Sequence, residues 1–140
     1  MRRQMFALAA VAVLALVLLA LPAGAASGNN PKASIQSGNA FCGADESTFP
    51  VIGFTNYHRV GNTVSVQYHL KKAIPNSTYV VELWGDFCSF FGVVTTVETN
   101  SNGVANGNGS VTVPASSTRF FATGLGPNGY NDTPAVTLNP

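Results

Sequence analysis

Apolar and polar residues alternate over Thr63–Leu70, which is the pattern of a β-strand with one buried face. The positions predicted to face the core are Val64, Val66, Tyr68 and Leu70. Residues 78–84 repeat the alternation, with Tyr79, Val81 and Leu83 on the face predicted to be buried. Residues 74–77 include a proline and an asparagine, and they predict a turn between these two strands.

Further strands are predicted over residues 32–36, 51–60, 93–99, 110–113, 118–123 and 134–138. Gly61 and Asn62 predict a hairpin turn before Thr63. In residues 51–60 the apolar side chains fall on both faces, so the pattern leaves open which face is buried. The whole pattern predicts an all-β, antiparallel two-sheet sandwich of about seven or eight short strands, although a barrel fits the same count.

Four of these segments carry a resemblance to a known class of fold, and they span residues 66–70, 75–83, 95–103 and 109–114. They resemble the immunoglobulin-like β-sandwich modules common in secreted bacterial proteins. In such modules a strand ends in an Asn-Gly turn, here Asn102 and Gly103, and the return strand ends at a proline, here Pro114. The resemblance covers residues 51–138 and implies the fold and an extracellular setting, but it carries no functional residues.

The chain departs from the antibody pattern at its cysteines. In antibody domains a disulfide joins two strands across the core, whereas Cys42 and Cys88 lie in segments with the composition of loops. A more distant similarity is to the small secreted apoproteins that carry enediyne chromophores. Those proteins share the size, the leader and the sandwich, but they have two disulfides where this chain has one pair of cysteines.

The first 26 residues have the order of a secretory signal peptide. Arg2 and Arg3 precede 17 apolar residues at positions 5–21, and small residues follow as far as Ala26. We expect cleavage after this leader and a single domain over residues 27–140 that is secreted or held at the cell surface. The alternative is an uncleaved anchor, because 17 apolar residues reach the lower limit of a membrane span.

Cys42 and Cys88 are the only two cysteines of the chain. Two thiols in a small domain outside the cytoplasm predict a disulfide. The closed loop of about 47 residues would then contribute on the order of 4 kcal/mol in the chain-entropy model. A metal-binding or reactive thiol pair is a poor fit, since the chain has no C-x-x-C motif.

Charge excludes some partners. The chain has seven Lys and Arg against six Asp and Glu, and two of the seven are the leader arginines, so five basic and six acidic residues remain. The five basic residues are scattered along the chain, which argues against a nucleic-acid partner. With the leader cleaved, we expect no membrane association either.

Catalytic and metal-binding chemistry find little support in the sequence, so we expect no enzyme and no cofactor. No serine lies in a G-x-S-x-G motif. His58 and His69 fall on the two strands of the predicted hairpin, where His58 would face Ser65 and His69 would face Phe54. At about 3.3 Å per residue the two imidazoles are then about 13 Å apart, too far to bind one ion.

Four aromatic residues surround Cys88, and they are the candidate binding residues: Trp84, Phe87, Phe90 and Phe91. They predict either a small core beneath the disulfide or an exposed contact surface. We expect Trp84 to face outward, because it points opposite to Leu83 along a strand. The hypothesis is a non-catalytic extracellular module that binds a protein, a glycan or a cell-envelope polymer. The alternative is a small ligand carrier or hydrolase with its site near residues 84–91.

Overall fold

The computed structural model describes residues 30–140, so the predicted leader lies outside the described residues. This part of the chain contains no α-helix, and none of its elements is a helix that could cross a membrane. Its elements are β1 (Lys32–Gln36), η1 (Phe41–Gly43), β2 (Val51–Val60), β3 (Thr63–Leu70), β4 (Thr78–Gly85), η2 (Asp86–Cys88), β5 (Ser89–Glu98), β6 (Ala105–Thr112), β7 (Arg119–Gly126), β8 (Gly129–Asp132) and β9 (Val136–Thr137). The all-β prediction is confirmed.

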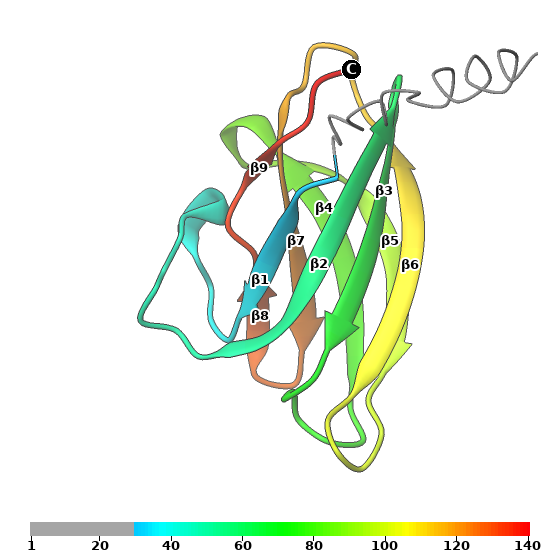
Figure 1. The fold of residues 1–140 in the computed structure, drawn as a ribbon. Helices are drawn as coiled ribbons and strands as arrows, with labels where there is room; N and C mark the ends of the chain where they lie inside the picture. The colour runs from blue at the N-terminus through cyan, green and yellow to red at the C-terminus, as the bar shows by residue number, and fades with distance from the viewer. Residues whose placement is uncertain (1–29) are drawn as a thin grey trace, which may run out of the picture.

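The strands form one antiparallel sheet in the order β5-β4-β7-β8-β1-β2-β3-β6, with β9 paired to β7. β5 and β6, the two ends of this order, come together, so the sheet nearly closes on itself (Figure 1). Glycine permits this close approach, since a Cβ at Gly109 would lie 2.0 Å from the carbonyl oxygen of Val94. This explains why β6 alternates asparagine with glycine.

The predicted alternation of buried and exposed side chains is confirmed in β3 and β4. The seven apolar residues expected in the core are all buried: Val64, Val66, Tyr68, Leu70, Tyr79, Val81 and Leu83. The buried tyrosine hydroxyls all find partners. Tyr57 bonds Thr133, Tyr68 donates to the carbonyl of Asn131, and Tyr79 accepts from the N–H of Ile74. Burial of these three tyrosines therefore leaves none of their hydroxyl groups without a hydrogen bond.

The sequence pattern left open which face of β2 is buried, and in the structure the buried face carries two polar residues. Thr55 and Arg59 point into the core beside Tyr57, while Phe54 lies on the outer face. Arg59 is buried because its guanidinium donates to carbonyls of the loop before β7 and of the C-terminal segment, among them Pro114, Ser117 and Leu138. A buried cation whose donors are all used in this way does not need an acidic partner.

Three strands differ from the prediction. β5 begins at Ser89, four residues before the predicted start, and β6 begins at Ala105 rather than at residue 110. β8 was not predicted at all, because Gly129–Asp132 contains only one apolar residue. Tyr130 and Asp132 lie in this unpredicted strand, and both belong to the candidate site.

Residues 37–50, which connect β1 to β2, cross the outer face of β4, β7 and β8, and we call them the crossing segment. The disulfide Cys42–Cys88 holds it there, with 5.1 Å between the two Cα atoms. Backbone hydrogen bonds hold it at two further points, from the N–H of Asp132 to the carbonyl of Gly38 and from the N–H of Ala135 to the carbonyl of Gly43. The crossing segment and the strands beneath it enclose the candidate site.

Candidate functional site

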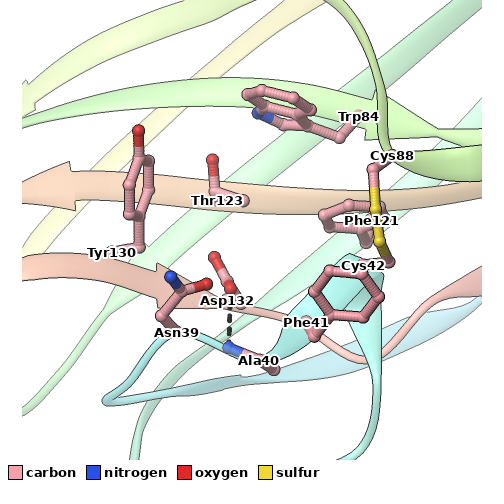
Figure 2. Close-up of a pocket in the computed structure, with 10 residues that line it drawn as sticks. All are labelled: Asn39, Ala40, Phe41, Cys42, Trp84, Cys88, Phe121, Thr123, Tyr130 and Asp132. Atoms are coloured by element: carbon pink, nitrogen blue, oxygen red, sulfur yellow. Dashed lines mark hydrogen bonds between the residues drawn. A yellow bond between two sulfur atoms is a disulfide. The ribbon is translucent and has the colours of Figure 1, made fainter.

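A groove of about 230 Å³ lies between the crossing segment and the outer face of β4, β7 and β8. We call it the disulfide groove, because Cys42 and Cys88 form one of its walls (Figure 2). Its lining residues are Asn39, Ala40, Phe41, Cys42, Trp84, Cys88, Phe121, Thr123, Tyr130 and Asp132. The prediction that Cys42 and Cys88 form a disulfide is confirmed.

Strand register places the groove residues on one face. Trp84 of β4 pairs with Phe121 of β7, and Thr123 of β7 pairs with Asp132 of β8. Side chains two apart along a strand share a face, so Phe121 and Thr123 both point outward from the sheet. Phe121 is nevertheless buried, because Gly43 of the crossing segment packs directly over its ring.

Trp84 presents its ring rather than its polar edge to the groove. The indole N–H donates to Oε2 of Glu82 at 2.9 Å, and the hydroxyl of Thr123 donates to the same oxygen at 3.5 Å. Phe90 packs against the indole in an edge-on arrangement, with 5.2 Å between the ring centroids. The indole is therefore fixed in orientation, and what remains for a ligand is an apolar aromatic surface.

Asp132 is the only charged residue among the groove's lining residues, and only 2% of it is exposed. Its Oδ2 accepts the backbone N–H of Ala40 at 2.8 Å. Its Oδ1 is the one buried side-chain oxygen or nitrogen in residues 30–140 without a hydrogen-bond partner. Burial raises the pKa of this carboxyl to about 6, and the bond from Ala40 offsets part of the rise.

The four predicted binding residues do not form a single surface. Trp84 and Phe90 are in contact beside the groove, and Phe90 is 51% exposed. Phe87, in the turn next to Cys88, is 99% exposed. Phe91 points the opposite way from Phe90 along β5 and packs against the core, with its ring 5.8 Å from that of Phe120.

The crossing segment adds another exposed aromatic residue. Phe41 precedes Cys42 and is 82% exposed, as Phe87 precedes Cys88 on the other side of the disulfide. Each residue of the bridge therefore follows a phenylalanine that faces solvent. Of the two, Phe41 also lines the groove, and an exposed apolar side chain there is typical of the rim of a binding site.

The two histidines lie away from the groove, on β2 and β3, and the residues predicted to lie opposite each of them are confirmed. His58 is opposite Ser65, and His69 is opposite Phe54. Each imidazole Nδ1 is hydrogen-bonded to the amide oxygen of an asparagine, His58 to Asn30 and His69 to Asn106. The described residues contain no group of three or more side chains that could bind a metal ion.

Sequence reasoning identified Cys42, Trp84 and Cys88 but missed the other seven of the ten residues that line the groove. Phe41, Phe121, Thr123, Tyr130 and Asp132 are distant from residues 84–91 in the sequence, and the topology brings them together. One signal was available. Tyr130 and Asp132 alternate within a short segment after a Gly-Pro-Asn-Gly turn, which is the pattern of a short strand.

Comparison with models of known protein families finds no match for this chain. No curated protein matches it either.

Proposed function

We propose that this chain is a non-catalytic, secreted binding module with an immunoglobulin-like sandwich fold, and that the disulfide groove is its ligand site. The antiparallel all-β architecture is compatible with that fold, although its strands form one nearly closed sheet. The disulfide supports an oxidising setting outside the cytoplasm. The basic and apolar order of the first 26 residues supports export. The partner is then a molecule met outside the cell.

The observation that carries the proposal is the composition of the groove. Its walls are Trp84, Phe121, Tyr130 and the disulfide, and a single buried carboxyl group lies among them. A concave apolar site with one converging polar group is typical of a small-molecule site, whereas a polymer or a protein surface requires a flatter patch. The groove therefore favours a module that binds a small molecule over one that binds a protein or a polymer.

The size of the groove limits the ligand. A volume of about 230 Å³ lies below the roughly 300–1,000 Å³ of sites for drug-sized molecules. One or two fused rings fit this space, and they match its aromatic walls. For a compound of about a dozen heavy atoms, ordinary ligand efficiency predicts a Kd on the order of 0.1–1 mM.

The test uses 1-naphthalenemethanol, an uncharged two-ring probe, with the secreted protein. Trp84 is the only tryptophan, so its fluorescence reports directly on the groove. We expect saturable quenching and amide chemical-shift changes confined to groove residues such as Ala40 and Thr123. Tyr130→Ala should weaken binding, while Phe54→Ala, on the opposite layer, should not. Shift changes that are absent or spread over the surface would overturn the proposal.

A hydrolase is the second candidate, and one observation favours it. Glu82, Thr123 and Asp132 lie side by side in register on β4, β7 and β8, which places two carboxyl groups on one face. Glycosidases use such a pair, with one group of raised pKa as the acid. Binding remains better supported, because Glu82 does not line the groove and its oxygen is engaged by Trp84. Cleavage of chromogenic glycosides that is lost in Asp132→Asn would reverse this order.

A further inference from the structure

The geometry of Asp132 points to the class of ligand: we infer that the disulfide groove binds a small aromatic amine, with its ring against Trp84 and its ammonium group on Oδ1 of Asp132. This inference rests on the proposed function, because it names the ligand class for the same groove. It goes further in requiring a positive charge at a defined place.

The first argument is the unequal use of the two carboxyl oxygens. Oδ2 of Asp132 is bound by the N–H of Ala40, and this bond fixes the orientation of the group. Oδ1 has no partner among the described residues, although it is buried. Figure 2 shows the carboxyl group among the groove residues, with one oxygen on Ala40 and the other directed toward the side of Thr123. An oriented, unsatisfied acceptor at a site wall matches a hydrogen-bond donor on a ligand.

The second argument is charge. The groove is lined by no lysine or arginine, so its one carboxylate has no cation beside it. A buried carboxylate without a cation is costly, and an ammonium group removes that cost while forming a charge-assisted hydrogen bond. An anionic ligand would instead face the carboxylate of Asp132, with no lysine or arginine in the lining to offset the repulsion. The groove thus selects for positive charge and against negative charge.

The third argument is the aromatic wall. The indole N–H of Trp84 is already bound to Glu82, so its ring face is the surface that remains. Tyr130, 38% exposed, lies on the same strand as Asp132, two residues away. An aromatic ring can stack on these side chains, and an ammonium group beside it gains from cation–π attraction.

The titratable groups around Asp132 are uncharged or acidic. Tyr57 and Tyr68 lie in the core beneath it, and burial raises the pKa of both, so both stay neutral at ordinary pH. Tyr130 lies on the same strand as Asp132, and Glu82 lies on β4. Asp45 accepts a hydrogen bond from the side chain of Gln36, which is the register partner of Asp132 on β1. Cation binding in the groove should therefore follow the ionisation of Asp132.

That ionisation sets a pH dependence for the amine. With a pKa of about 6, roughly a tenth of the Asp132 carboxyl is ionised at pH 5 and nearly all of it at pH 7.5. An alkylammonium stays charged over this whole range. Amine binding should therefore weaken about tenfold from pH 7.5 to pH 5, while binding of a neutral ring compound should change little.

The test compares three probes of matched shape: 1-naphthylmethylamine, 1-naphthalenemethanol and 1-naphthoate. Titration of Trp84 fluorescence and calorimetry at pH 7.5 should rank them as amine first, alcohol second and carboxylate last. Asp132→Asn should weaken the amine about 10- to 100-fold, the range of a charge-assisted bond, and leave the alcohol within about threefold. Glu98→Gln is the matched control, because it removes one carboxylate at the end of β5, opposite Thr78 and away from the groove lining.

The outcomes separate the two proposals. An amine that binds no more tightly than the alcohol, or that is insensitive to Asp132→Asn, overturns the inference and leaves the proposed function standing. Failure of all three probes to shift groove amides overturns the proposed function. If Asp132→Asn does not fold, the pH dependence of amine binding to the unmodified protein decides, and equal affinity at pH 5 and pH 7.5 would refute the inference.

Discussion

The carboxylate of Asp132 accepts a hydrogen bond from the backbone N–H of Ala40 at 2.8 Å, although the two residues are 92 positions apart in the sequence. The bond fastens the crossing segment to β8. It also holds the carboxyl group where burial disfavours its ionised form. The resulting rise in the pKa of Asp132 makes the stability of the protein depend on pH.

The first prediction concerns the pH dependence of stability. The unfolded chain releases the Asp132 proton near pH 3.8, whereas the folded protein keeps it to about pH 6. The stability that the protonated group contributes below pH 4 is therefore lost as the pH rises through 6. The difference in unfolding free energy between the protein and Asp132→Asn should shift by up to about 2 kcal/mol between pH 4 and pH 7.5, in favour of the variant at pH 7.5. Urea unfolding at both pH values measures it, and a difference that does not vary with pH would contradict the prediction.

The second prediction concerns the disulfide. Replacing Cys42 and Cys88 together with alanine should lower the free energy of unfolding by about 2–5 kcal/mol, because the bridge restricts the unfolded chain. The groove should be lost as well, since only hydrogen bonds and the packing of Gly43 on Phe121 then hold the crossing segment. Denaturation in urea measures the first effect, and fluorescence of Trp84 follows the second. A variant with unchanged stability and ligand affinity would show that the bridge is dispensable.

The third prediction separates the aromatic residues near Cys88 by their burial. Phe87→Ala should change stability by less than about 0.5 kcal/mol, because the side chain is 99% exposed. Phe91→Ala should cost about 1–3 kcal/mol, less than for a fully buried ring, since this ring is only partly covered by the core. The same chemical change at both sites makes the melting temperatures directly comparable. Equal losses would mean that the turn of Phe87 is packed in solution.

The fourth prediction concerns Arg59. Arg59→Met keeps much of the apolar stem but removes the donors that satisfy carbonyls of the loop before β7 and of the C-terminal segment. We expect a loss of at least about 3 kcal/mol, because several acceptors lose their partner at once. Lys72→Met, at an exposed position, is the control and should have little effect. Hydrogen exchange should show the loss of protection beginning in the C-terminal segment.

The fifth prediction concerns residues 1–26. N-terminal sequencing of the protein from the culture medium should give a first residue near Ser27, because the basic, apolar and small-residue order directs cleavage there. Protein found only in membranes, with Met1 or Arg2 at its terminus, would contradict both cleavage and secretion.

Local patterns identified most of the strands, but they identified the buried face in only some of them. The alternation in Thr63–Leu70 identifies the buried face from the sequence alone, because neighbouring side chains point to opposite faces of any strand. In β2 the same reasoning fails, because Arg59 is buried and Phe54 is not. A buried arginine is possible only where distant carbonyls accept its hydrogen bonds, and no local pattern records those carbonyls.

The sequence by itself determined the all-β class, the hairpin at Gly61 and Asn62, and the pairing of Cys42 with Cys88, since each depends on short-range periodicity or on there being only two cysteines. Only the tertiary structure decided the site. Trp84 and Asp132 face one groove because β7 pairs with both β4 and β8, and because the crossing segment covers that face of the sheet. Strand neighbours of this kind are set by the sum of long-range contacts, which no single segment of the chain encodes.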